Sequence, residues 1–172
     1  MAVFIPVLIA LALLGGWLMG SEQRLEVKKD GTPAPLLHLE VKPGAYFSVW
    51  FFHSYDRSYF EEHYCLTEKG TLLLSHMSFK SSLNGQGFEF GTYRCRPDGS
   101  AELADINKEL DEVIFRLGSP DLANHTLIID GQRLSLLDYA EPGDLMNLSV
   151  VSQPRWKHIW SKCFFPRRGR RG

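Results

Sequence analysis

Hydrophobic and polar positions alternate in short runs along most of this chain, and glycine or proline separates one run from the next. Pro97-Asp98-Gly99 and Asp130-Gly131 each lie between two such runs and are typical of tight turns. With turns about every eight to twelve residues, the pattern predicts an all-β domain, either an antiparallel β-sandwich or a barrel. The clearest runs lie at residues 36–41, 46–52, 59–66, 71–79 and 145–151.

One segment does not follow this alternation. Residues 101–117 read AELADINKELDEVIFRL, whose Ala, Leu, Glu and Lys content favours a helix. We expect the second half to form a strand and leave the first half open between helix and strand. The β-domain is thus expected over residues 36–152, after a polar linker at 21–35 that contains KKDGTPAP.

The first twenty residues carry no charged side chain. Twenty apolar residues in a helix can cross a hydrocarbon layer of roughly 30 Å. Residues 1–20 are therefore expected to be a transmembrane anchor or a secretory signal segment; the anchor is favoured because the basic start of a signal is missing. Arg24, Lys28 and Lys29 follow this segment, and the positive-inside tendency alone would keep the β-domain in the cytoplasm.

Charge is distributed unevenly along the 172 residues. Residues 1–152 contain twelve Lys and Arg against twenty Asp and Glu, a net charge of −8, whereas residues 153–172 carry +7. An acidic body does not favour nucleic acid as a partner. A chain of this length is also expected to form one folded domain with a single hydrophobic core.

The basic tail at residues 153–172 has an amphipathic pattern. Its aromatic and aliphatic side chains recur at helical spacing, Pro154 suits a first turn and Pro166 an end, so the tail predicts a short interfacial helix that contacts anionic lipid. The alternative is a solvated tail without stable helix. The expected contact residues are Trp156, Ile159, Trp160, Phe164, Arg167, Arg168, Arg170 and Arg171.

The stretch FFHSYDRSYFEE at residues 51–62 holds the first candidate chemistry. If 47–54 and 59–66 pair across the loop YDRS, His53 faces Phe60 and shares a face with Glu62; a one-residue slip would pair His53 with Glu61 instead. Either carboxylate would suit His53 to acid–base work. Ser54 points to the opposite face from His53, which argues against a nucleophilic pair, and a structural hydrogen-bonded turn is the alternative.

A longer ordered set of segments resembles a known family. FSVWFFHSYDRSYFEEHY, FKSSLNGQGFE and RLGSPDLANHTLIIDGQRLSLLD, over about residues 35–150, resemble family 1850 among the domains of unknown function. The resemblance implies an envelope-located accessory role beside TRAP-type solute transporters of the TAXI class, and so an extracytoplasmic β-domain. The matching positions are His53, Ser54, Glu61, Phe79, Gly85, Gly118, Asn124 and His125.

Other candidate sites are weaker. His63 and Cys65 alternate on one strand face and could bind zinc with His53 or Cys95, although no Cys-x-x-Cys pair fixes such a site. Cys65 and Cys95 could form a disulfide if their strands are neighbours; free thiols are the alternative. We expect no cofactor, because no phosphate loop, nucleophile elbow or dinucleotide fingerprint is present in the sequence.

Three functions follow from these observations. The first is a single-pass inner-membrane accessory domain that contacts the membrane subunits or the solute-binding protein of a TRAP-type transporter. The second is a small hydrolase or metal-assisted enzyme centred on His53 and Glu61, with Ser54 and His125 as further candidates. The third is an envelope ligand-binding module in which Trp50, Phe52 and Tyr59 line the pocket.

Overall fold

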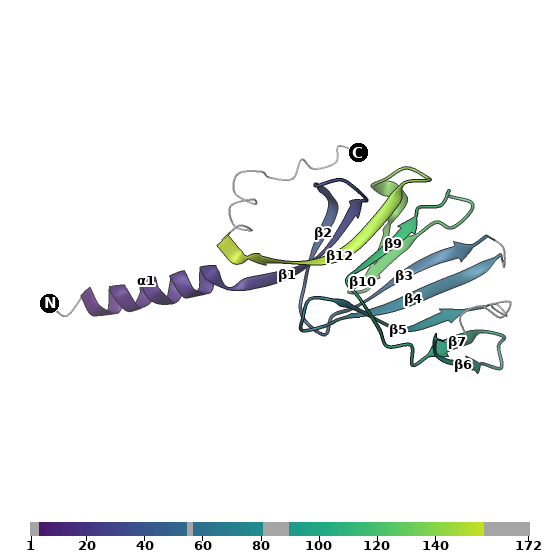
Figure 1. Cartoon of the computed structure of the whole chain (residues 1–172), viewed down its shortest axis with the longest axis horizontal. Coiled ribbons are helices and arrows are strands. Elements are labelled where there is room, and N and C mark those ends of the chain that lie inside the picture. Colours follow the sequence, from purple (N-terminus) through teal and green to yellow (C-terminus); the bar gives the residue numbers. More distant parts are fainter. Residues whose placement is uncertain (1–3, 55–56, 81–89, 157–172) are drawn as a thin grey trace.

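The computed structural model describes residues 4–54, 57–80 and 90–156. Strands dominate this part of the chain, as the alternating sequence pattern predicts (Figure 1). In chain order the elements are α1 (Phe4–Met19), β1 (Ser21–Lys29), β2 (Pro35–Val41), β3 (Tyr46–His53), β4 (Ser58–Leu66), β5 (Leu72–Phe79), β6 (Thr92–Cys95), β7 (Ala101–Ala104), β8 (Lys108–Leu110), β9 (Glu112–Arg116), β10 (Thr126–Ile129), β11 (Gln132–Ser135), the 3₁₀ helix η3 (Leu136–Asp138) and β12 (Leu145–Pro154).

The strands form two antiparallel sheets, which confirms the all-β prediction. The small sheet has the order β2-β1-β12-β9, and the large sheet has the order β11-β10-β3-β4-β5-β7-β6, with β8 paired to β5. Neither sheet closes on itself, so the barrel alternative is not formed. Figure 1 shows the small sheet beside the large one, with α1 extending away from both.

The core lies between the two sheets. Leu25 and Val27 of β1 belong to the same buried cluster as Phe47 and Val49 of β3, and each is at most 5% exposed. Burial of such side chains is the main favourable term in folding. Because side chains alternate along a strand, the positions between these residues point outward. We call the core side of the large sheet its inner face and the opposite side its outer face.

The predicted linker at residues 21–35 is wrong over most of its length. Ser21–Lys29 is β1, which pairs with β12 along its full extent and with β2 on its other side. The reason is the alternation in SEQRLEVKK: Leu25 and Val27 enter the core, while the polar residues Arg24, Glu26 and Lys28 beside them take the other face. The β-domain therefore begins directly after α1.

The segment 101–117 forms strands throughout its regular parts. Its second half contains β9, as predicted, and its first half, for which helix remained open, contains β7 and β8. Ala101 and Leu103 are buried, and both pack in a second apolar cluster with Phe60 and Phe79. Pairing with β5 and burial in this cluster outweigh the helical preference of the Ala and Glu residues.

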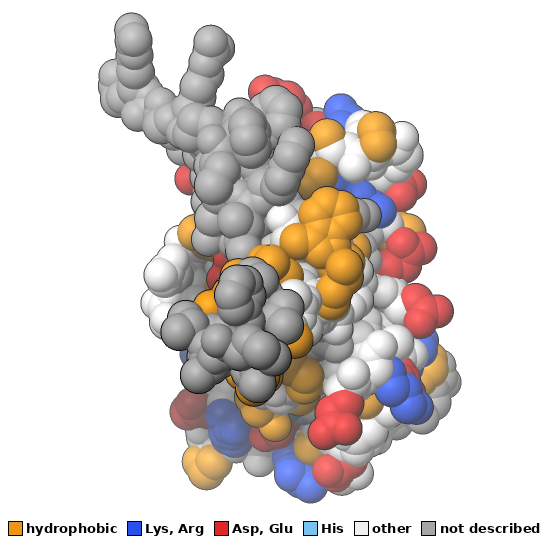
Figure 2. Space-filling model, turned by 90° about the vertical axis from the view of Figure 1, so that its left-hand side faces the viewer, with side chains coloured by type: hydrophobic (Ala, Val, Ile, Leu, Met, Phe, Trp, Pro, Cys, Tyr) orange, Lys and Arg blue, Asp and Glu red, His pale blue; other side chains and the backbone are white. Residues whose placement is uncertain are grey.

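The apolar N-terminal segment forms α1 at Phe4–Met19. Its side chains Val7, Ile9, Leu13, Leu14, Trp17 and Met19 are each 51–74% exposed. Figure 2, which views the molecule from this end, shows hydrophobic side chains gathered where the chain projects. Among the described residues, no helix reaches the length and apolarity needed to cross a membrane. The predicted transmembrane span is therefore not confirmed.

Candidate functional site

The register between β3 and β4 differs from the predicted one by two residues. His53 pairs with Ser58, and Trp50 pairs with Glu61. We expected His53 to face Phe60; β3 ends at His53 and β4 begins at Ser58, so the connection starts one residue before the predicted loop 55–58. Because Glu61 lies opposite Trp50, three positions before His53, the side chains of His53 and Glu61 point to opposite faces of the sheet. The predicted His53–Glu61 centre is not formed.

His53 and His125 lie instead among the aromatic rings of the inner face. The imidazole of His53 is centred 4.8 Å from the ring of Phe60 and 6.5 Å from that of Phe51. His125 is only 7% exposed and stacks between Phe51 at 5.1 Å and Phe115 at 4.5 Å. Burial lowers the pKa of His125 to about 4, so this imidazole is neutral at neutral pH. Both histidines thus pack as aromatic side chains.

Ser54 is exposed in the turn after His53. Its neighbours in sequence, residues 55–56, lie outside the described chain. Gly85 of the resembling segments lies outside the described residues as well. Asn124 accepts a hydrogen bond from the hydroxyl of Ser135 at 3.4 Å and precedes the buried His125. The four predicted catalytic candidates therefore do not converge: His53 and His125 are on the inner face, Ser54 is in the turn, and Glu61 is on the outer face.

Glu61 belongs to a polar cluster on the outer face of the large sheet. The hydroxyl of Ser48 donates a 2.5 Å hydrogen bond to its Oε1 atom. Beside this pair, the imidazoles of His63 and His76 are stacked with their centroids 4.1 Å apart and their planes at 7°. We call the set Ser48, Glu61, His63, Ser75, His76 and Ser78 the histidine cluster.

Serine hydroxyls fix both imidazoles of the histidine cluster. Nε2 of His63 lies 2.8 Å from Oγ of Ser78, and Nδ1 of His76 lies 2.9 Å from Oγ of Ser75. The Ser75 hydroxyl also donates to the backbone carbonyl of His63 at 3.0 Å. Ser75 stands at a register shift between β4 and β5, and this bulge places it beside both histidines.

Electrostatics keep His63 neutral. Burial is the largest cause that lowers the pKa of His63, and the neighbouring His76 lowers it further, while Glu61 and Glu102 act in the opposite direction. A neutral imidazole offers one donor and one acceptor. The histidine cluster is therefore suited to hydrogen bonding with a partner at neutral pH.

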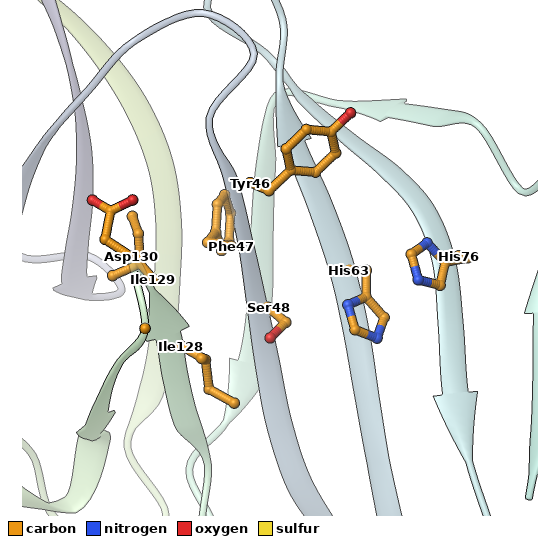
Figure 3. A pocket seen from close by; sticks show the side chains of 9 residues that line it. Tyr46, Phe47, Ser48, His63, His76, Ile128, Ile129 and Asp130 are labelled. Carbon is orange, nitrogen blue, oxygen red and sulfur yellow. The ribbon is translucent and has the colours of Figure 1, made fainter.

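A shallow hollow of about 240 Å³ lies beside this cluster. Figure 3 shows Tyr46, Ser48, His63 and His76 side by side on three neighbouring strands, with Ile128 and Asp130 of the β10–β11 hairpin on the other side. Tyr46 is 70% exposed. On the same face Trp50 lies beneath the guanidinium of Arg133, 5.7 Å from the ring centre. The outer face thus combines the exposed ring of Tyr46 and the half-buried ring of Trp50 with polar groups.

The aromatic residues expected to line a pocket do share this outer face. Phe52 pairs with Tyr59, and Trp50 lies two positions away on the same strand. All three are half-buried. They lie next to the histidine cluster, but the hollow itself is lined by other residues.

Sequence reasoning missed four members of the histidine cluster. Ser48, Ser75, His76 and Ser78 interrupt hydrophobic runs that we expected to be plain strands. A polar residue at alternate positions of β3 was a usable signal for Ser48, because it marks the outward face. The pairing of His63 with His76 was not readable, because it depends on the bulge at Ser75.

Neither predicted use of the cysteines is formed. Cys65 and Cys95 are both free thiols, the first half-buried and the second exposed. Their strands β4 and β6 are separated in the sheet by β5 and β7, so the side chains are too far apart to bond. Within the described ranges, no three His, Cys, Asp or Glu side chains are grouped to hold a metal ion.

The C-terminal tail is described only at its start. Arg155 and Trp156 are helical, and Trp156 is 41% exposed. The other predicted lipid contacts lie outside the described residues: Ile159, Trp160, Phe164, Arg167, Arg168, Arg170 and Arg171.

The comparison with known proteins assigns a family and no activity. The model of the family described as "Domain of unknown function (DUF1850)" matches residues 47–136. This segment begins in β3 and ends in η3, so it contains the large sheet together with β9. No curated protein and no solved structure is similar to the chain. The match covers more than half of the 172 residues, and the chain belongs to the DUF1850 family.

Proposed function

We propose that this protein is a non-enzymatic, membrane-associated accessory β-domain of a TRAP-type solute uptake system of the TAXI class. In this proposal α1 holds the chain at the inner membrane, and the outer face of the large sheet contacts the membrane subunits or the solute-binding protein. The β-domain lies on the extracytoplasmic side. The ordered segments that resemble the TAXI-associated family support a TRAP-type transporter of this class as the partner.

The observation that carries the proposal is the combination of an exposed apolar helix and an exposed aromatic sheet face. A helix that is apolar on all sides needs apolar surroundings. The outer face offers the exposed ring of Tyr46, the half-buried ring of Trp50 and the histidine cluster, and aromatic side chains are enriched where proteins bind one another. The family match contains this sheet and leaves out α1, β1, β2 and β12.

Co-purification tests the contact surface. Tagged protein from solubilised membranes of cells that contain a TAXI-class transporter should retain transporter components, and Tyr46→Ala should retain much less. Ile114→Ala is the matched control, because Ile114 is 45% exposed on β9 in the small sheet. Equal retention by both variants, or no transporter component with the unaltered chain, would overturn the proposal.

The hydrolase alternative would have to be centred on His63 and Ser78, because the His53–Glu61 centre is not formed. The 2.8 Å contact between His63 and Ser78 is of the length required for a base and its nucleophile. However, the Glu61 carboxylate is bound by Ser48, and the face of His63 is covered by His76. If the unaltered chain hydrolyses p-nitrophenyl esters and Ser78→Ala abolishes this activity, the enzyme alternative is supported. Under our proposal, Ser78→Ala leaves the rate of ester hydrolysis unchanged.

A further inference from the structure

The two ends of the described chain leave the sandwich at one place. β1 begins at Ser21, directly after Gly20 at the end of α1, and Ser21 pairs with Pro154 at the end of β12. The next residue, Arg155, donates its backbone N–H to the carbonyl of Gly20 at 2.9 Å. Figure 1 shows α1 and the end of β12 meeting at this corner.

The side chain of Arg155 connects α1 to the sandwich by three contacts. Its Nε atom donates to Oε1 of Glu22 at 3.1 Å, and its Nη1 atom donates to the carbonyl of Trp17 at 3.4 Å. The centre of the guanidinium lies 5.2 Å from the centre of the Trp17 ring. We call Trp17, Gly20, Glu22 and Arg155 the Arg155 clasp.

Each contact of the Arg155 clasp has a physical reason. A cation is favoured at the C-terminal end of a helix, where the last carbonyls are unpaired. A planar guanidinium can lie over an indole ring and donate hydrogen bonds in its own plane, which the ammonium of lysine cannot do. The clasp therefore requires arginine specifically, and it fixes α1 against both β1 and the end of β12.

Gly20 provides the space for this arrangement. A Cβ atom at position 20 would lie 3.1 Å from the Trp17 carbonyl oxygen and 3.2 Å from Nη1 of Arg155. Both contacts are tighter than ordinary van der Waals distance. A side chain at this position would push the guanidinium away from the end of α1.

The surroundings of α1 follow from how its exposed residues are distributed. The sixteen residues of α1 are all apolar, and at about 100° per residue Val7, Ile9, Leu13, Leu14, Trp17 and Met19 project over about two thirds of the helix circumference. A helix that enters a groove of a protein presents one apolar stripe. Apolar side chains in all directions fit a lipid bilayer, which surrounds a helix on every side.

We infer that the Arg155 clasp is a positioning device that holds the sandwich in one orientation on a phospholipid bilayer. Trp17 and Arg155 are in contact at the base of α1, Trp156 follows Arg155 in the chain, and Trp and Arg are favoured at the level of lipid headgroups. A flexible tether would be sufficient for anchoring alone. A clasped helix also fixes the direction in which the outer face of the large sheet points. This inference rests on the membrane association proposed above.

Distances between two spin labels test the inference in the full chain. One label is placed in α1 with Leu13→Cys and one in the small sheet with Ile114→Cys, both exposed sites, in a background with Cys65→Ser, Cys95→Ser and Cys163→Ser. The protein is reconstituted in vesicles of phosphatidylcholine and phosphatidylglycerol. With Arg155 intact we expect a single narrow distance distribution. Arg155→Gln and Arg155→Lys should both lose the narrow peak, and Gly20→Ala should broaden it.

Arg133→Gln is the matched control, because Arg133 makes a similar contact with Trp50 far from α1 in the sheet order. It should leave the narrow peak unchanged. A peak that survives both Arg155 substitutions while the chain still floats with the vesicles overturns the clasp and leaves the proposed function standing. A chain that does not float with the vesicles overturns the bilayer as the partner of α1, and with it the proposed membrane association.

Discussion

At the scale of single residues, the packing around His125 on the inner face shows a role for this side chain that its place in the family pattern does not reveal. His125 belongs to the ordered positions that resemble the family, and a histidine in such a set is easily taken for a catalytic group. Its stacking between Phe51 and Phe115 shows that it fills the core. The sequence around His125 alternates as a strand should, but it does not show which rings lie above and below.

We predict that protonation of His125 destabilises the fold in acid. Its pKa is about 4 in the folded chain against an ordinary 6.5, so between these values the unfolded chain binds a proton that the folded chain does not. Stability should fall by about 3 kcal/mol as the pH drops through this window. His125→Phe keeps a stacked ring and cannot be protonated. Urea unfolding from pH 7 to pH 4 should show a smaller loss in this variant; the same loss as in the unaltered chain would contradict the assignment.

Ionisation of Glu62 should have the opposite pH dependence: it destabilises the fold as the pH rises. Burial raises the pKa of this carboxyl, although the hydroxyl of Tyr64 donates to Oε2 at 2.6 Å and acts in the lowering direction. Because the folded-state pKa is raised, stability is fully present below the ordinary value of 4.5 and is lost as the pH rises through the folded-state pKa. Glu62→Gln keeps an acceptor for Tyr64 without the charge.

The thermal midpoint of Glu62→Gln should exceed that of the unaltered chain at neutral pH, and the gain should vanish in acid. Glu61→Gln, one position away on the outer face, is the control and should show no such gain. An unchanged or lower midpoint for Glu62→Gln at neutral pH would show that the carboxylate is adequately compensated.

At the scale of elements, strand existence was predictable and strand register was not. Alternation located β2, β3, β4, β5 and β12, because burial of one face leaves a period of two in the sequence. The predicted loop between β3 and β4 began one residue too late, which shifts the strand register by two residues, since a polar turn can close at either SYDR or YDRS without a strong glycine signal. That shift is small, and it decided which residue lies opposite His53.

Polar strands were the second source of error. Seven of the nine residues of β1 are polar or charged, which is typical of a linker, and the two apolar residues Leu25 and Val27 are too few to predict a strand that pairs with both β2 and β12. Among the histidine cluster, only Glu61 and His63 were singled out beforehand. The stacked pair depends on a bulge, and a bulge leaves no clear pattern in one sequence.

The connection between β9 and β10 depends on Gly118. A Cβ at this position would lie 2.2 Å from the carbonyl oxygen of Leu122 and 2.5 Å from that of Ala123, so the backbone of the connection would have to move. We expect Gly118→Ala to lower the free energy of unfolding by about 1–3 kcal/mol. Gly15→Ala is the control, because no atom lies within 4 Å of the added methyl group. Denaturant unfolding measures both; equal midpoints for the two variants would contradict the packing argument.

At the scale of the whole molecule, the sandwich separates two different surfaces. The apolar helix α1 and the Arg155 clasp occupy one end, and the histidine cluster occupies the outer face of the large sheet. Under the proposed function, α1 attaches the domain to a membrane while the large sheet faces another protein. The family match agrees with two separate surfaces, since it covers the large sheet and leaves out α1.

The location of the domain can be tested with its own exposed thiol. Cys95 on β6 is exposed, and Cys65 is half-buried. If the β-domain is extracytoplasmic, a membrane-impermeant maleimide added to spheroplasts should label Cys163→Ser protein, and Cys95→Ser should remove most of that label. Labelling that appears only after the cells are lysed would place the domain in the cytoplasm, as the basic residues after α1 alone would favour.

The most direct test of the proposed function is photo-crosslinking from the outer face in native membranes. Tyr46 is 70% exposed beside the histidine cluster, and it is replaced by the photoreactive p-benzoylphenylalanine in cells that contain a TAXI-class TRAP transporter. Our account predicts a crosslink to a membrane subunit or to the solute-binding protein, and none of comparable yield when the same group replaces Ile114 on the small sheet. Crosslinks of equal yield from both positions, or crosslinks from position 46 that contain no transporter component, would contradict it.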